Sequence, residues 1–152
     1  VSVGVLSGGM AGRLFIEVRE KRGLVYRVSA SHSAARGRAG VFAFAGTTPE
    51  NAEETLSVMQ KELSGLANGV SEEELNRSKA DIKSRVVMQG ESTSMRASSL
   101  VNDYWNLGRI RSLAEVKEGI DAVSVEDVVR HAKEYPVSAV TLVALGTKKL
   151  CL

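Results

Sequence analysis

Two side chains that could hold a carbonyl oxygen, Arg19 and Tyr26, stand seven positions apart in the run RLFIEVREKRGLVY from Arg13 to Tyr26. A guanidinium and a phenol are both hydrogen-bond donors, and donors aimed at such an oxygen stabilise negative charge that develops on it. Nothing else in the sequence resembles a complete active site. Composition alone favours a plainer interpretation, in which Arg19 is a surface helix residue paired with a glutamate and Tyr26 is a half-buried strand residue. Both interpretations are open at this point.

Ligands for a metal ion are scarce. The two histidines, His32 and His131, are far apart, and the one cysteine, Cys151, excludes an internal disulfide and a cysteine-based metal site. Residues 131–135 read H-x-x-E-Y, in which Tyr135 stands where the zinc-binding pattern H-x-x-E-H has its second histidine. No serine lies in a G-x-S-x-G turn. We therefore expect no metal site, no cofactor site and no catalytic nucleophile in this segment.

A glycine-rich turn, GGMAG from Gly8 to Gly12, comes directly before the run that holds Arg19. A helix N-terminus can bind an anion. The lysine of a phosphate-binding loop is absent, however, and the glycine spacing is not that of a dinucleotide site. A close turn between two elements is the favoured interpretation, and anion binding is the alternative.

The elements that must position Arg19 and Tyr26 are a helix and a strand. Apolar residues at helical spacing predict a helix over 11–21, and Gly23 suits its C-terminal cap. Alternation then predicts a strand over 24–34 that is followed by a second strand over 41–46, together an antiparallel hairpin. One face of the first strand is expected to carry Leu24, Tyr26, Val28, Ala30 and His32.

Helices dominate the rest of the chain. Thr48 and Pro49 are expected to start one helix, and the capping box Ser71–Glu74 another, which Gly90 interrupts near Glu91-Ser92. Three more helices are expected: one with an apolar face of Ala97, Leu100, Val101, Tyr104 and Trp105, one over 113–120, and one that opens at Ser124 and ends before Pro136.

The last segment, AVTLVAL over 139–145, is apolar on both faces, as a covered central strand would be. The order of elements predicts an α+β fold, with helices packed on one face of a mainly antiparallel sheet, in a single domain over 1–152. Three strands make a thin sheet for this many helices. We therefore expect further strands, on the N-terminal side or from another chain, and expect 1–152 to be part of a larger protein.

Charge and composition exclude several classes of function. The chain has 152 residues, 43% of them hydrophobic, and a net charge of +2, which is too small to indicate nucleic-acid binding. Residues 1–40 carry seven Lys and Arg against two Glu, which is either ordinary surface charge or a basic wall that faces a substrate or a second domain. The apolar runs are too short for a membrane span, and no signal peptide is visible. We expect a soluble protein, with the cytoplasm favoured over the periplasm and the compartment left open.

The segment SGGMAGRLFIEVREKRGLVYRVSA resembles the signature of the non-catalytic half-domain of the pitrilysin/insulinase family. These inverzincin zinc metallopeptidases include the mitochondrial processing peptidases and bacterial two-part proteases. The resemblance continues along nearly the whole chain. It includes the G-T-x-P-E pattern over 46–50, the G-V-S-x-x-E-L pattern over 69–75, Glu91-Ser92, and the stretch over 124–128.

The resemblance implies a fold and a shared active site. The fold would be the α+β metallopeptidase half-domain, similar to those of LuxS and the processing peptidases, without its N-terminal strands. Two halves would close around a peptide: one binds zinc through H-x-x-E-H, and the other reaches the scissile carbonyl with an Arg and a Tyr, which map onto Arg19 and Tyr26. Zinc is thus expected on the partner half, on the same or another chain. The assembly would be dimeric or multi-domain, and this segment inactive alone.

The expected function is therefore that of the non-zinc-binding domain of a zinc-dependent metalloendopeptidase, which closes over a peptide substrate and stabilises the scissile carbonyl. The alternative is a non-catalytic structural or assembly module of a peptidase-like complex. Nucleic acid and membranes are not expected as partners.

Overall fold

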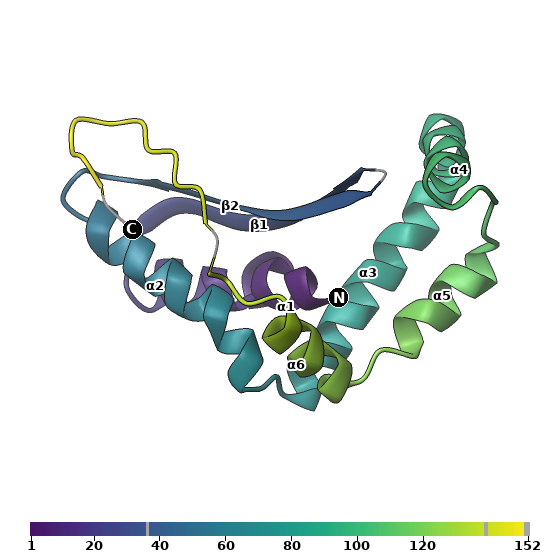
Figure 1. Cartoon of the computed structure of the whole chain (residues 1–152), viewed down its shortest axis with the longest axis horizontal. Coiled ribbons are helices and arrows are strands. Elements are labelled where there is room, and N and C mark those ends of the chain that lie inside the picture. The colour runs from purple at the N-terminus through teal and green to yellow at the C-terminus, as the bar shows by residue number, and fades with distance from the viewer. Residues whose placement is uncertain (36, 139, 151–152) are drawn as a thin grey trace.

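A long β-hairpin arches over a layer of short helices in the computed structural model, which describes residues 1–35, 37–138 and 140–150 (Figure 1). The hairpin consists of β1 (Val25–Ala35) and β2 (Arg38–Thr47), paired antiparallel. Its turn includes Gly37, whose φ of 77° favours glycine. The predicted hairpin is confirmed, and with it the α+β class.

The pairing of the two strands is interrupted once, at Tyr26. Val25 pairs with Thr47 and Arg27 pairs with Gly46, so Tyr26 is an additional residue without a partner of its own. Such a bulge changes the direction in which side chains point. Leu24 and Val25 are consequently both buried, and Tyr26 does not share the core face on which it was expected.

The helices beneath the hairpin come from two parts of the chain. The first part contributes α1 (Ser2–Ser7), the 3₁₀ turn η1 (Gly9–Ala11) and η2 (Phe15–Glu20), and the second contributes α2 (Ala52–Gly65) and η3 (Leu66–Asn68). Together with β1 and two later helices, α3 (Glu72–Glu91) and α6 (Val125–Glu134), they enclose the core. The core consists of Val5, Leu6, Leu14, Val18, Leu24, Val25, Met59, Leu66, Val70, Leu75 and Val128. The core thus lies directly under the start of β1.

The remaining helices are α3 (Glu72–Glu91), α4 (Thr93–Leu107), α5 (Leu113–Asp121) and α6 (Val125–Glu134). In Figure 1, α3, α4 and α5 extend away from the hairpin as an arm, whereas α6 packs against η3. Capping boxes begin α3 and α6, in which the hydroxyls of Ser71 and Ser124 accept from the backbone N–H three residues on. These predicted helices are confirmed, and α4 ends at a C-cap glycine, Gly108, where φ is 70°.

Two helices begin later than predicted. The helix predicted over 11–21 is observed as η2 over Phe15–Glu20. Residues 48–51 form a turn closed by the N–H of Asn51 donating to the carbonyl of Thr48 at 3.2 Å, so α2 begins at Ala52 rather than at Pro49. The interruption predicted near Glu91-Ser92 is confirmed: α3 ends at Glu91, one residue after Gly90, and Ser92 becomes the N-cap of α4.

The strand predicted over 139–145 is wrong for the described part, 140–145; Ala139 lies outside the described residues. Residues 140–145 run as irregular chain beside the hairpin (Figure 1), and Val143 and Leu145 are almost fully exposed. Apolar character favours a strand only where a neighbouring strand supplies ladder hydrogen bonds, and within the described residues the sheet has two strands, β1 and β2.

The apolar face predicted on α4 is also not covered. Val101, Tyr104 and Trp105 are each about two-thirds exposed. The buried residue of α4 is Asp103, which accepts hydrogen bonds from the backbone and guanidinium of Arg111.

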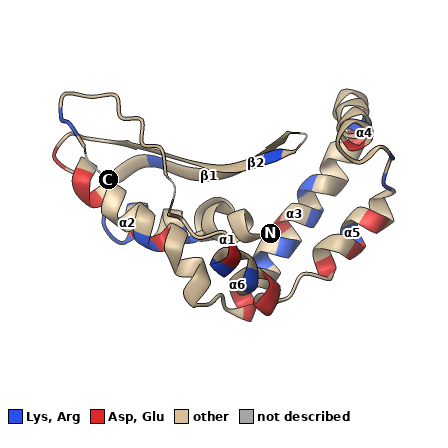
Figure 2. Cartoon of the chain, in the orientation of Figure 1, with Lys and Arg blue, Asp and Glu red and all other residues tan. Residues whose placement is uncertain are grey.

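Charge is distributed unevenly over these elements (Figure 2). Acidic residues are prominent on α5 and α6, whereas residues 25–47, which form the hairpin, contain arginines but no Asp or Glu. No helix in the described part of the chain combines the length and the apolar character needed to cross a membrane.

Candidate active-site donors

Arg19 lies on η2, which is wound as a π-helix. The N–H of Lys21 donates to the carbonyl of Ile16 at 2.9 Å, five residues back instead of four. Turns of this kind are rare and occur frequently at functional sites. Val18 on the inner side is fully buried, so the exposed Arg19 extends from a segment that is anchored in the core.

The guanidinium of Arg19 is held by an aromatic ring. Its Cζ lies 5.1 Å from the centre of the Phe15 ring, within the range of a cation–π interaction. The glutamate nearest in sequence on its N-terminal side, Glu17, instead bonds Lys21 at 2.6 Å and Arg22 at 2.9 Å, and these bonds lower the pKa of Glu17. Among the described residues Arg19 therefore makes no ion pair, contrary to the plainer interpretation of this residue.

A fixed turn connects Arg19 to Tyr26. Gly23 adopts φ of 63°, as predicted for a C-terminal cap, and its N–H donates to the carbonyl of Arg19 at 2.9 Å. The N–H of Leu24 donates to the carbonyl of Val18 at 3.1 Å. The backbone that bears Arg19 is thus tied at two points to the residues that lead into β1.

Tyr26 projects from the bulge with 75% of its surface exposed. It is not the half-buried strand residue of the plainer interpretation. Arg19 and Tyr26 are brought to adjacent elements with both polar groups open to solvent. Among the described contacts no hydrogen bond joins the two side chains.

Two neighbours of the donors were not predicted. Phe15, beneath Arg19, could have been found from the spacing of four residues that brings side chains together on a helix. Arg27 follows Tyr26 in the sequence, and its Cζ lies 5.9 Å from the centre of the Phe44 ring.

An ion pair fixes the start of the donor segment. Arg13 donates to Glu74 from Nε at 2.6 Å and from Nη2 at 2.8 Å, and Nη2 also donates to the carbonyl of Gly69. Glu74 accepts from the N–H of Ser71 as well, so the capping box of α3 and the ion pair share one carboxylate. These bonds, with that of Arg13 the strongest, lower the pKa of Glu74 to about 2.

The glycine-rich turn before Arg13 is closely packed. A methyl group on Gly12 would lie within 2.8–2.9 Å of backbone atoms of Leu6, Ser7 and Gly8. This arrangement corresponds to the favoured interpretation, a close turn between two elements.

The metal-ligating residues do not come together in the described ranges 1–35, 37–138 and 140–150, where no group of three His, Cys, Asp or Glu could hold a metal ion. His32 lies on β1, and His131 lies on α6 with its ring 4.9 Å from that of Tyr135. The described residues of this chain therefore do not fit a zinc ion.

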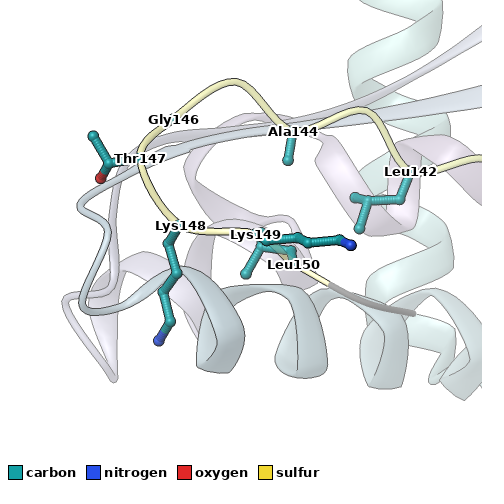
Figure 3. Close-up of a pocket in the computed structure, with 7 residues that line it drawn as sticks. All are labelled: Leu142, Ala144, Gly146, Thr147, Lys148, Lys149 and Leu150. Atoms are coloured by element: carbon teal, nitrogen blue, oxygen red, sulfur yellow. The ribbon is translucent and has the colours of Figure 1, made fainter.

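A hollow of about 560 Å³ lies in the C-terminal segment (Figure 3). It is lined by Leu142, Ala144, Gly146, Thr147, Lys148, Lys149 and Leu150. Neither Arg19 nor Tyr26 contributes to it, so it is separate from the donor pair.

Comparison with known proteins decides the family. Residues 3–82, just over half of the chain, match the family described as the peptidase M16 inactive domain. The chain belongs to the peptidase M16 inactive-domain family. The resemblance to the pitrilysin/insulinase peptidases is thereby confirmed, and the matched residues include the whole donor segment and both strands of the hairpin.

Relatives of this M16 domain are named as zinc proteases. An uncharacterised zinc protease of Rickettsia felis is 28% identical over 147 residues, which cover 96% of this chain and 35% of that protein. The uncharacterised zinc protease YmxG of Bacillus subtilis is 31% identical over 125 residues, 82% of this chain and 31% of YmxG. The chain thus spans about a third of the length of the relatives it matches.

Solved structures show the same fold. A crystal structure of a peptidase M16 inactive domain from Pseudomonas fluorescens superposes with a TM-score of 0.77 at 25% identity, over 88% of this chain and 32% of that one. A protease from Helicobacter pylori superposes with a TM-score of 0.74 at 25% identity, over 87% of this chain and 32% of that one. The half-domain fold expected from the sequence is confirmed.

Proposed function

We propose that this M16 domain is the non-zinc-binding part of a zinc metalloendopeptidase, which closes over a peptide substrate and donates hydrogen bonds from Arg19 and Tyr26 to the scissile carbonyl oxygen. The observation that carries the proposal is that both side chains are exposed and that, in the part of the chain that the structure describes, neither has a structural partner that would occupy its polar group. Arg19 makes no ion pair among the described residues and rests on Phe15, and Tyr26 projects from a bulge. Neither side chain contributes to the core, so a structural role does not account for them.

The chemistry suits the two residues. Attack of water on a peptide carbonyl places negative charge on its oxygen, and a donor that is already in position stabilises that charge. A cation and a neutral phenol that approach from adjacent elements can both donate to one oxygen, because a carbonyl oxygen has two lone pairs.

The zinc, the water and the base must come from elsewhere, because the described residues hold no metal-binding group. We assign them to a second half-domain. Relatives that are about three times as long as this chain leave room for that half in the same polypeptide. The hairpin supports the peptide part of the proposal, since Phe42 and Phe44 are more than half exposed on β2 and could contact substrate side chains.

The test uses the assembled peptidase, with the zinc-bearing half on the same chain or added as a second chain. Tyr26→Phe and Arg19→Ala are each expected to lower kcat on a peptide by roughly 10²–10³-fold, the effect of removing one oxyanion donor. Matched controls are Tyr104→Phe, on the distant α4, and Arg22→Ala, which removes an arginine paired with Glu17. Both controls should retain kcat. An unchanged kcat in both donor variants would exclude the catalytic role.

The second candidate is a non-catalytic module that stabilises a peptidase-like complex. The uncovered apolar face of α4, with Val101, Tyr104 and Trp105, favours it, because faces of this kind commonly contact another protein. This candidate requires neither donor. It predicts that Tyr26→Phe is silent, and that neither the remainder of the protein nor its partner contains H-x-x-E-H.

A further inference from the structure

The G-T-x-P-E pattern over 46–50 lies at the end of β2, opposite the bulge that bears Tyr26. Its second residue, Thr47, pairs with Val25 on one side of the bulge, and its first, Gly46, pairs with Arg27 on the other. The two neighbours of Tyr26, Val25 and Arg27, are therefore both paired with residues of the G-T-x-P-E pattern.

Thr47 makes a further bond beyond the strand ladder. Its Oγ1 donates to the carbonyl oxygen of Leu24 at 2.5 Å, two residues before Tyr26. A threonine hydroxyl has a single hydrogen to donate, so Oγ1 is an acceptor toward any other donor. The Oγ1 of Thr55 on α2 donates to it at 3.3 Å, and Thr55 is almost completely buried.

The bonds thus run in one direction, from α2 through Thr47 to the Leu24 carbonyl. Leu24 and Val25 are buried in the core, and Tyr26 is the first residue of β1 to leave it. Tyr26 has no partner of its own in the strand pairing. The direction of its side chain therefore depends on the pairs Val25–Thr47 and Arg27–Gly46 on either side.

We infer that Thr47 is a positioning residue for Tyr26: its hydroxyl fixes the Leu24 carbonyl and so fixes the bulge that directs the Tyr26 phenol toward the substrate carbonyl. This inference rests on the proposed function of Tyr26. It assigns the G-T-x-P-E pattern a part in the shared site, although Thr47 itself does not touch the substrate.

The test measures kcat and KM of the assembled peptidase with Thr47→Val, which keeps the branched shape and removes the hydroxyl. A displaced donor is expected to lower kcat by roughly 10–100-fold, with KM within about twofold, because a donor that acts in the transition state affects kcat. Thr47→Ser, which keeps the hydroxyl, should restore kcat. If Thr47→Val does not fold, Thr47→Ala gives the same comparison without the valine methyl groups.

Two further variants separate positioning from general stability. Thr55→Val removes the other hydroxyl but leaves the bond from Thr47 to Leu24, so kcat should stay within about threefold of wild type. In a Tyr26→Phe background, Thr47→Val should cause no further loss of kcat beyond about twofold, because the group it positions is already gone.

Each outcome has a separate meaning. The inference is overturned if Thr47→Val lowers kcat no more than Thr55→Val does. It is also overturned if Thr47→Val lowers kcat by the same factor in the Tyr26→Phe background as in wild type, because Thr47 would then not act through Tyr26. If Tyr26→Phe itself has no effect on kcat, the proposed function fails first, and the inference fails with it.

Discussion

Replacement of Glu74 by Gln should destabilise the domain in a pH-dependent manner. The change keeps the shape of the side chain and its ability to accept from the N–H of Ser71, but it removes the charge that pairs with Arg13 at 2.6 and 2.8 Å. The bonds lost are those that attach the donor segment to the first turn of α3.

The magnitude follows from the pKa of Glu74. A fall from 4.5 to about 2 corresponds to about 3.5 kcal/mol of folding stability at neutral pH, at about 1.4 kcal/mol per pKa unit. The Arg13 and Glu74 side chains keep 19% and 22% of their surface exposed, and solvent screening reduces the effect. We therefore expect Glu74→Gln to cost about 2 kcal/mol at pH 7.

The sign of the pH dependence is fixed by the direction of the shift. Because the folded-state pKa of Glu74 lies below its unfolded value, the stabilisation is complete above about pH 4.5 and is lost as the pH falls toward 2. The difference between wild type and Glu74→Gln should therefore be constant from pH 7 to pH 5.5 and less than half as large at pH 3.

Urea unfolding at pH 7, 5.5, 4 and 3 measures this difference, and Glu73→Gln is the matched control. Glu73 is one residue away on the same helix turn, but its side chain is 79% exposed in its pair with Arg77, so its replacement should cost less than about 0.5 kcal/mol. Equal losses for the two variants, or a loss for Glu74→Gln that does not change with pH, would refute the reasoning.

Four other changes have expected outcomes, each measured by urea unfolding at pH 7. Gly12→Ala should lower the free energy of unfolding by about 1–3 kcal/mol, because the new methyl group meets backbone atoms. Gly90→Ala, inside α3 with open space around it, should raise the free energy of unfolding by about 0.5–1 kcal/mol. If Gly90→Ala destabilises the domain more than Gly12→Ala, the packing described at Gly12 is contradicted. Asp103→Asn should lower the free energy of unfolding by about 1–3 kcal/mol, because it weakens the hydrogen bonds that Arg111 donates to this side chain. A loss below about 0.5 kcal/mol would mean that these hydrogen bonds do not stabilise the fold. Leu14→Ala should cost about 2–5 kcal/mol, since Leu14 is fully buried; a smaller loss would mean that the core closes around the cavity.

Local signals in the sequence predicted most of the elements. These signals are the capping box at Ser71, the helix start at Ser124, the glycine cap at Gly23 and the alternation of the hairpin. Each concerns residues within a few positions of one another. Interactions at this range do not depend on the rest of the fold, so the sequence is sufficient to predict them.

The features that were not predicted depend on contacts between distant segments. The bulge at Tyr26 arises from pairing with β2, and the bond between Arg13 and Glu74 joins residues 61 positions apart. The strand expected over 139–145 depended on a neighbouring strand that periodicity does not reveal. The candidate donors Arg19 and Tyr26 were thus chosen by their types and by resemblance, whereas their exposure and the contacts that support them required the structure.

The winding of η2 has a consequence for insertions and deletions. Each residue of an α-helix advances by about 100°, and a turn closed five residues back contains one residue more than an α-turn. Deletion of one residue between Ile16 and Lys21 would allow the turn to close four residues back, as in an α-helix. The segments on the two sides would then keep nearly the same orientation, because the wide turn is what accommodates the additional residue. A related domain that lacks one residue in this turn can therefore keep its flanking residues in register, so such domains should be aligned on the turn itself and not on residue count across it.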